Sequence, residues 1–189
     1  MGAPREGLGQ FFRALLDFLD DRRLRQQVYA VVSPETRALM DRPPRPLAFV
    51  PSRPIDEIED ALQKIAGPEI CEACGLACAR PLGWTLLQPV LRLAFQLLGQ
   101  SPEPIFGNLD RFFSLVTRGI SFSWERREKG GTVIARFEGP DLPEAPLHVL
   151  RGSLLFAFEA TSTLGRVGPP EVVESTADRT IVRYQVEWS

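Results

Sequence analysis

The last third of the chain switches between the spacing of strands and the spacing of a helix, and this order constrains the fold more than any other feature. At its start Ile120, Phe122 and Trp124 alternate with serines. Gly130 and Gly131 follow a charged run and favour a turn. The predicted order is strand, strand, helix, strand, strand, over residues 120–124, 132–137, 147–162, 172–175 and 180–188. This ββαββ unit predicts a four-stranded, mainly antiparallel sheet with one helix across a face.

The preceding part of the chain is predicted to be helical. Its apolar residues recur three and four positions apart, as on one face of an amphipathic helix. Helices are predicted over residues 8–19, 24–32, 33–40, 54–66, 69–80, 82–98 and 102–118. Five prolines within residues 42–54 predict an extended crossover. We therefore expect an α+β fold in a single domain over residues 1–189, with a helical half at 1–118 and the ββαββ half at 119–189.

Charge and hydropathy argue against two classes of protein. The formal net charge is −2 and the pI is near 5.6, so the chain lacks the basic surface of a nucleic-acid-binding protein. No apolar run approaches the length of a membrane span, and the N-terminus lacks the basic-then-apolar order of a secretory signal. Clustered cysteines without such a signal favour a reducing compartment, so we expect a cytoplasmic protein.

Three cysteines lie close together at Cys71, Cys74 and Cys78. On a helix, spacings of three and four residues place the sulfur atoms along one face. Such thiolates can bind zinc or an iron–sulfur cluster, or form a redox pair through Cys71 and Cys74. A structural zinc site needs four ligands, however, and the chain has no second cysteine pair. Packing among neighbouring alanines is the favoured interpretation, with metal binding and redox chemistry as alternatives.

The chain contains no recognisable catalytic apparatus. Its only histidine, His148, is interpreted as an ordinary residue at the start of a helix. No metalloprotease, nucleophile-elbow, phosphate-binding or dinucleotide-binding motif accompanies it. Four carboxylates are expected on one solvated helix face: Asp56, Glu57, Glu59 and Asp60. We therefore expect a protein that is not an enzyme.

The predicted helix over residues 147–162 carries apolar side chains around most of its circumference, with Arg151 and Glu159 as its charged residues. A helix of this kind is buried on more than one side. One side is expected against the sheet. The other is covered either by the helical half of the same chain or by a second subunit, so a homodimer is one of two alternatives.

Several segments together resemble an uncharacterised protein family expanded in myxobacteria. They are the run from Ser33 to Leu39, the proline-rich segment through Pro54, the run Phe106-Gly107-Asn108-Leu109, and the terminal ββαββ unit that ends at Trp188. That family looks like a distant relation of the haem-NO-binding (H-NOX), vinyl-four-reductase and transport-particle Bet-three-like folds. The resemblance implies a helical layer followed by an antiparallel sheet with an interleaved helix. It also implies that some members hold a small or hydrophobic ligand between the layers.

The chain departs from the haem-binding branch of that fold at the residues that hold the cofactor. That branch carries a ligating histidine on a helix before the sheet and a Tyr-x-Ser-x-Arg motif. The predicted helices over residues 82–98 and 102–118 contain no histidine, and the motif does not occur. The sequence therefore argues against haem, and we expect no cofactor unless the cysteines hold zinc or an iron–sulfur cluster.

These observations predict a non-enzymatic protein that binds or senses a small hydrophobic molecule in a pocket between the helical layer and the sheet. Aromatic residues near the junction of the layers are expected to line it: Phe95, Phe112, Phe113, Phe122, Trp124 and Phe156. The same six residues also fit a plain packed core. Two other functions stay open, namely an adaptor that binds protein partners without a ligand, and a metal- or redox-responsive switch at the cysteines.

Overall fold

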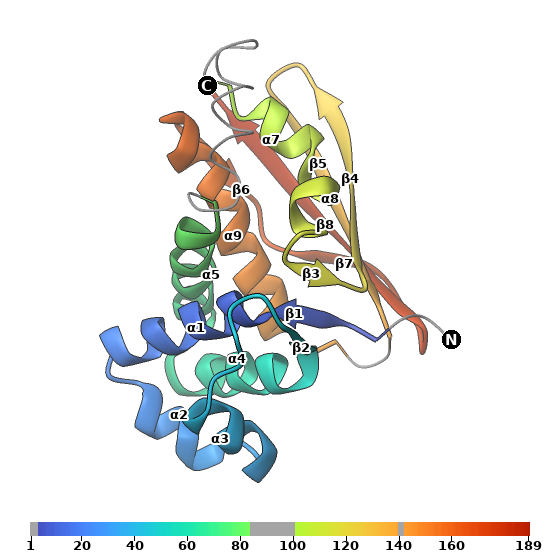
Figure 1. Ribbon diagram of the computed structural model, residues 1–189. Helices are drawn as coiled ribbons and strands as arrows, with labels where there is room; N and C mark the ends of the chain where they lie inside the picture. The colour runs from blue at the N-terminus through green and yellow to red at the C-terminus, as the bar shows by residue number, and fades with distance from the viewer. Residues whose placement is uncertain (1–3, 84–100, 140–141) are drawn as a thin grey trace.

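A five-stranded antiparallel sheet forms one side of the molecule (Figure 1). The structure is a computed structural model that describes residues 4–83, 101–139 and 142–189. The strands of this sheet are β4 (Ile120–Arg127), β5 (Gly130–Glu138), β6 (Gly165–Val167), β7 (Glu171–Ser175) and β8 (Arg179–Trp188). Their order is β4-β5-β8-β6, and β7 also pairs with β8. The predicted α+β class and the antiparallel pairing are confirmed, whereas β6 is a strand that the sequence pattern did not predict.

Helices pack against this sheet and form a layer beyond it. They are α1 (Gly9–Asp21), α2 (Arg25–Val31), α3 (Pro34–Asp41), α4 (Ser52–Ala66), α5 (Pro68–Leu82), α7 (Glu103–Gly107), α8 (Leu109–Phe113) and α9 (Ala145–Thr161). The first five begin and end within two residues of the predicted bounds. The helix predicted over residues 82–98 lies outside the described residues from residue 84 onward. Within the described ranges, none of the helices is long and apolar enough to span a membrane.

Alternation along β8 determines which face of the sheet is buried. Val182, Tyr184 and Val186 are at most 1% exposed, whereas Arg183 and Gln185 between them are exposed. The buried side chains join those of β4, β5, α7, α8 and α9 in one apolar core. Side chains of successive strand residues point to opposite faces, so this pattern places α7, α8 and α9 on the inner face.

The hairpin between β4 and β5 differs from the predicted turn. Arg127 pairs with Gly130, so the loop consists of Glu128 and Lys129, and the glycine belongs to β5. The φ of Gly130 is +132°, and a Cβ at this position would lie 2.1 Å from the carbonyl oxygen of Val186 in β8. Glycine is therefore required for close pairing of the strands rather than for the loop.

A second, three-stranded sheet joins segments that the sequence pattern did not mark as strands. β1 (Glu6–Leu8) pairs with β2 (Phe49–Pro51) and with β3 (Thr117–Arg118), in the order β2-β1-β3. Strands of two or three residues are too short to show alternation. The helix predicted over residues 102–118 is wrong, because β3 falls inside it and because Asn108, with φ −119° and ψ 16°, separates α7 from α8.

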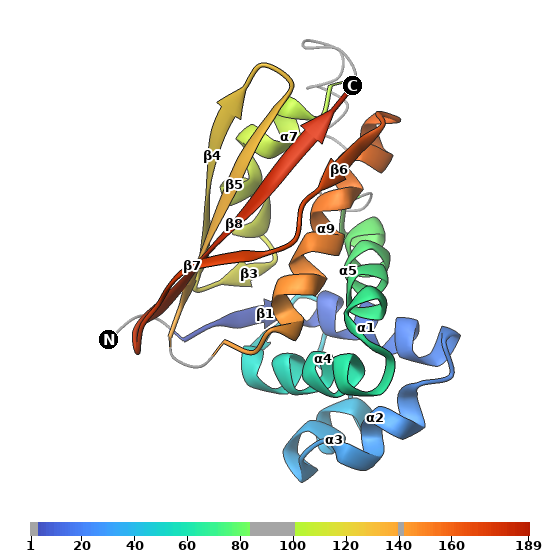
Figure 2. The ribbon, with the colours of Figure 1, turned by 180° about the vertical axis from the view of Figure 1, so that it is seen from behind.

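Helix α9 lies between the five-stranded sheet and α5 (Figures 1 and 2). On the sheet side, the hydroxyl of Tyr184 donates a hydrogen bond of 3.0 Å to the carbonyl oxygen of Leu147. On the α5 side, Ser153 Oγ donates to the carbonyl oxygen of Gly75 at 3.2 Å. The second side of this apolar helix is thus covered by the helical half of the same chain, which was one of the two alternatives. The homodimer stays a prediction, but the apolar surface of α9 is no longer a reason to expect it.

Candidate functional site

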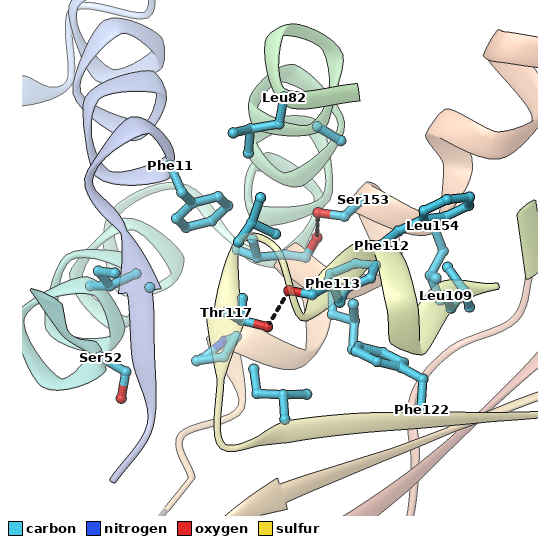
Figure 3. Close-up of a pocket in the computed structure, with 18 of the residues that line it drawn as sticks. Phe11, Ser52, Leu82, Leu109, Phe112, Phe113, Thr117, Phe122, Ser153 and Leu154 are labelled. Atoms are coloured by element: carbon cyan, nitrogen blue, oxygen red, sulfur yellow. Dashed lines mark hydrogen bonds between the residues drawn. The ribbon is translucent and has the colours of Figure 1, made fainter. Parts of the chain in front are cut away.

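A cavity of about 160 Å³ lies where the helical layer meets the sheet (Figure 3). Its described walls come from α1, α4 and α5, from α8 and β4, and from α9. Most lining side chains are apolar, among them Phe11, Leu82, Leu109, Phe112 and Leu154. An apolar cavity of about 150 Å³ is large enough to hold benzene. The dimensions and lining therefore fit a small, mostly apolar molecule.

Four of the six aromatic residues that we expected at a ligand line this cavity. Phe112 and Phe113 come from α8, Phe122 from β4 and Phe156 from α9. The rings of Phe113 and Phe122 pack with their centroids 4.4 Å apart. Phe95 lies outside the described residues. The structure thus brings residues from separate elements together around one space, and their contact with a ligand stays a prediction.

Trp124 is not among the residues that line this cavity. Its ring stacks on Phe106, with centroids 5.2 Å apart, and on Trp188, with centroids 6.1 Å apart. Phe106 also contacts Phe158 of α9, with centroids 5.6 Å apart. This aromatic stack connects α7 and α9 with β4 and β8. The ring of Trp124 thus packs within the core beside this cavity, and its contact with a ligand stays a prediction.

Two hydrogen bonds fix the wall of the cavity that α8 forms. The carboxylate of Asp110 accepts from the backbone N–H of Phe122 at 2.8 Å, which ties α8 to β4. The hydroxyl of Thr117 donates to the carbonyl oxygen of Phe113 at 3.1 Å (Figure 3). The first bond ties α8 to β4 and the second ties α8 to β3, so the aromatic pair Phe113 and Phe122 has a fixed position at the wall.

Polar side chains from α4 and the N-terminal segment also line the cavity. The guanidinium of Arg5 pairs with the carboxylate of Asp56, with 2.8 Å between Nη2 and Oδ2. Ser52 Oγ donates to the same carboxylate at 3.3 Å. Burial raises the pKa of Asp56 above its ordinary value, although Arg5 and Ser52 act in the opposite direction. Asp56 is therefore a buried residue with two partners and not, as expected, part of a solvated face.

Glu59 lies three residues further along α4 and lines the same cavity. The residue is 3% exposed, and its carboxylate makes no hydrogen bond or ion pair with any residue that the structure describes. Burial, together with the negative charge of Asp56, raises the pKa of Glu59 well above its ordinary value of 4.5. The expected solvated position is wrong here too. A buried, unpartnered carboxyl is costly to folding, which makes it a candidate functional group.

The other two carboxylates of α4 have structural partners. Glu57 accepts hydrogen bonds from the backbone N–H of Ser33 at 2.6 Å, from its hydroxyl at 2.8 Å and from the hydroxyl of Thr36. Glu57 thereby anchors the start of α3, whose cap is Ser33. Asp60 pairs with Lys64 at 2.6 Å on the surface. Of the four carboxylates, Glu57 and Asp60 have the partly solvated positions that the sequence predicted, whereas Asp56 and Glu59 are buried.

The three cysteines lie in the core of the helical layer. Cys71, Cys74 and Cys78 are each 0% exposed, and the sulfur atoms of Cys74 and Cys78 are 3.9 Å apart. Burial, with the nearby carboxylate of Glu59, raises the pKa of Cys71 to about 12. Metal binding and disulfide exchange both require a thiolate. Within the described residues no three His, Cys, Asp or Glu side chains are arranged to hold a metal ion. The packing interpretation agrees with this geometry, and the metal and redox alternatives stay untested.

His148 lies in the first turn of α9, as expected. Its Nε2 is 3.3 Å from Glu144 Oε1, and its Nδ1 is 3.6 Å from Glu72 Oε1. Glu72 also pairs with Arg151, whose Nε donates to the carbonyl oxygen of Val167 at 3.0 Å. The imidazole thus belongs to a charged network that joins α5, α9 and β6. It is not among the residues that line the cavity.

Comparison with solved structures identifies the fold. The chain superposes on an Fe(II) unliganded H-NOX protein, a mutant from K. algicida, with a TM-score of 0.71 and 11% identity over 96% of both chains. A structure that concerns haem distortion in the H-NOX family gives 0.66, with 11% identity over 96% of this chain and 94% of the other. An oxygen-binding H-NOX domain related to soluble guanylate cyclases gives 0.63, with 12% identity over 96% and 95%. The expected H-NOX-like fold is confirmed.

Sequence comparison adds nothing to this likeness. No protein-family model and no curated protein matches the chain. At 11–12% identity, the solved structures show what fold the chain has and not what it binds. The expected myxobacterial family stays untested.

The expectation about cofactors is corrected by these structural neighbours. The sequence argued against haem because the ligating histidine and the Tyr-x-Ser-x-Arg motif are missing. The fold, however, is shared over almost the whole chain with proteins that are described by their haem or their Fe(II) state. The missing motifs were therefore not sufficient ground for setting haem aside, because solved proteins of this fold are described by their haem.

The lining of the cavity shows how far the described residues fit a haem. Iron in haem proteins is ligated by histidine, cysteine, methionine or tyrosine side chains. The described lining contains apolar groups, hydroxyls, carboxylates and Arg5, but none of those four residue types. The walls are suited to the apolar faces of a ring system. The described residues therefore supply apolar contacts but no axial ligand for iron.

Proposed function

We propose that this protein binds a small, mostly apolar molecule in the cavity and acts as a ligand-sensing domain. The observation that carries the proposal is the apolar cavity at the junction of the two layers. Its aromatic walls come from four separate elements, through Phe11, Phe112, Phe122 and Phe156. Ligand sites are typically concave and apolar, with a few polar groups that orient the ligand. Arg5, Asp56 and Glu59 supply such groups here.

A sensing role requires that the ligand favours one arrangement of the protein over another. Helices α4 and α5 form one part of the cavity wall, and α8 with β4 forms another. A ligand that contacts both parts stabilises the arrangement in which they lie close together. Through this coupling, binding of a ligand in the cavity would change the position of α8 and the sheet. A binding role, rather than catalysis, agrees with the structural neighbours, one of which is described as oxygen-binding.

Binding of toluene, measured by isothermal titration calorimetry, tests the proposal. Ala79 lines the cavity, and Ala79→Leu adds a side chain that occupies part of it. We expect saturable binding of one toluene by the natural protein and at least a tenfold loss in Ala79→Leu. Ala38→Leu, on the exposed face of α3, is the matched control and should bind as the natural protein does. Absence of binding, or equal binding by Ala79→Leu, would favour the adaptor that works without a ligand.

Hemin is titrated in parallel because the structural neighbours include haem proteins. A sharp Soret band that saturates at one hemin per chain and is abolished by Ala79→Leu would make haem the occupant of this cavity. Saturable binding of toluene without such a band assigns the cavity to a smaller ligand. Native mass spectrometry of the purified protein would identify any molecule that copurifies.

A further inference from the structure

The carboxyl of Glu59 gives the cavity a chemical preference that its apolar walls alone do not have. We propose that the natural ligand is a small apolar amine, whose ammonium group pairs with the carboxylate of Glu59 while its hydrocarbon part lies against the aromatic walls. This inference rests on the proposed function, since it assumes that the cavity is the binding site. It adds the class of molecule that the site selects.

The position of Glu59 on α4 directs its side chain to the cavity. Ser52, Ile55, Asp56 and Glu59 are spaced by three and four residues and all line the cavity, so this stripe of the helix faces it. The described side-chain nitrogen and oxygen atoms that are sealed from solvent and make no hydrogen bond are Arg37 Nε, Trp124 Nε1 and His148 Nδ1. The oxygens of Glu59 also lack a partner, but they are not sealed, so free space lies next to them. Because Glu59 lines the cavity and is only 3% exposed, this free space is the cavity.

The neighbouring charges leave Glu59 in need of a cation. Arg5 already has a carboxylate partner, because its two terminal nitrogens lie 2.8 and 3.4 Å from the oxygens of Asp56. Glu6, which also lines the cavity, is paired with Arg118 at 3.0 Å. Each of these cations and anions is therefore matched within the protein. A ligand with one positive charge would complete the balance at Glu59, whereas a ligand carboxylate would be repelled.

The walls set the size and shape of the rest of the ligand. A volume of about 160 Å³ holds one six-membered ring with a short substituent. Phe11, Phe112, Phe113 and Phe122 present aromatic surface to this space. Aromatic faces attract both hydrocarbon groups and ammonium ions. A primary amine with a single ring could therefore pack its ring against the aromatic walls and pair its ammonium group with the carboxylate of Glu59.

The protonation of Glu59 gives a second readout. The titratable or charged groups that act on it are Asp56 of α4, Arg5 of the N-terminal segment and Cys78 of α5. Burial raises its pKa, so an empty site favours the neutral carboxyl. When the ligand arrives as an ammonium ion, the proton of Glu59 leaves to solvent and an ion pair forms. Binding should therefore strengthen as the pH rises from 5 to 8, and it should release protons, which calorimetry in two buffers detects.

Benzylamine and benzyl alcohol are nearly isosteric, and toluene lacks their polar group, so the three probes separate the charge from the ring. The natural protein should bind benzylamine about tenfold more tightly than either of the other two, because a charge-assisted hydrogen bond is the stronger one. Glu59→Gln should lose about tenfold in affinity for benzylamine and keep its affinity for toluene. Asp60→Asn removes the adjacent surface charge on α4 and should change neither value.

The outcomes distinguish this inference from the proposed function. If toluene binds but benzylamine binds no better, or if Glu59→Gln leaves benzylamine binding unchanged, the amine inference is overturned and the binding function stands. If no probe binds to the natural protein, the proposed function fails first. Glu59→Met is a second variant that removes the carboxyl with little change in volume. It should bind toluene at least as well as the natural protein and benzylamine about tenfold less well than the natural protein does.

Discussion

Gly75 of α5 and Gly152 of α9 each face the backbone of the opposite helix. A Cβ on Gly75 would lie 1.8 Å from the carbonyl oxygen of Val149, and a Cβ on Gly152 would lie 1.9 Å from that of Glu72. Real Cβ atoms do not approach backbone oxygens this closely, so both positions require glycine. Because neither glycine has a side chain, the backbones of α5 and α9 come into direct contact where the helices cross. That crossing holds α9, which lines the cavity, against the helical layer.

Gly75→Ala and Gly152→Ala should therefore each destabilise the protein. An added methyl group has to push two backbones apart, and overpacking of this kind costs about 1–3 kcal/mol of unfolding free energy. Chemical denaturation followed by circular dichroism measures the change. Gly107→Ala is the matched control, because a Cβ there would have nothing within 4 Å. It should be neutral or slightly stabilising, and an equal loss at Gly107 would contradict this explanation.

Tyr184→Phe should lower the unfolding free energy by about 1 kcal/mol. The side chain is 0% exposed, and its hydroxyl is bonded to the carbonyl oxygen of Leu147 in the first turn of α9. Removal of the hydroxyl deletes this buried hydrogen bond between β8 and α9, and one such bond contributes about 1 kcal/mol. Tyr29→Phe removes an exposed hydrogen bond of 2.9 Å to Asp41 and should change stability by less than about 0.5 kcal/mol. Similar losses in the two variants would argue against a role of Tyr184 in joining the sheet to α9.

Cys71→Ala and Cys78→Ala should each cost about 1–2 kcal/mol of unfolding free energy, without loss of any bound metal. Both side chains are fully buried in the apolar core of the helical layer, so truncation leaves a small void. Elemental analysis of the purified protein and of both variants accompanies the denaturation series. Stoichiometric zinc or iron that disappears in either variant would favour the metal site over packing.

The sequence predicts the elements whose pattern is long enough to read. In β8, Val182, Tyr184 and Val186 alternate with exposed residues over ten positions, so the strand and its buried face are both predictable. β1, β2, β3 and β6 have at most three residues each and show no period. Their pairing depends on residues far away in the chain, such as Gly7 with Val50 and Thr117. Local spacing contains no information about such pairs.

The candidate site shows the same limit in a different form. Aromatic residues near the layer junction were predictable as lining, and Phe112, Phe113, Phe122 and Phe156 do surround the cavity. Glu59 was assigned to solvent because a helix with many carboxylates is usually exposed on that face. Its spacing from Ile55, four residues earlier, was a signal that it shares an apolar stripe. Which stripe of α4 faces a cavity depends on the packing of α1, α5 and α9, and no local rule provides that.

The last prediction concerns the cost of keeping Glu59 in its position. Glu59→Met should stabilise the protein at pH 8 by about 1–3 kcal/mol, the usual cost of a buried polar group without a partner. Methionine fills nearly the same volume and has no charge to bury. Asp60→Asn, on the partly solvated side of α4, should change the unfolding free energy by less than about 0.5 kcal/mol.

The advantage of Glu59→Met should depend on pH in a defined direction. In the unfolded chain Glu59 titrates at its ordinary pKa of 4.5, whereas burial and Asp56 raise its pKa well above that value in the folded protein. Between these two pKa values the folded state holds a proton that the unfolded state has lost. The proton on Glu59 therefore contributes to the stability of the natural protein. This contribution is fully present below pH 4.5 and is lost as the pH rises through the pKa of Glu59 in the folded protein. The difference between the two proteins should be small near pH 4 and should grow toward pH 8. Urea denaturation of both proteins from pH 4 to pH 8 measures this difference in unfolding free energy. If the difference is the same at every pH, burial does not raise the pKa of Glu59 and this explanation is wrong.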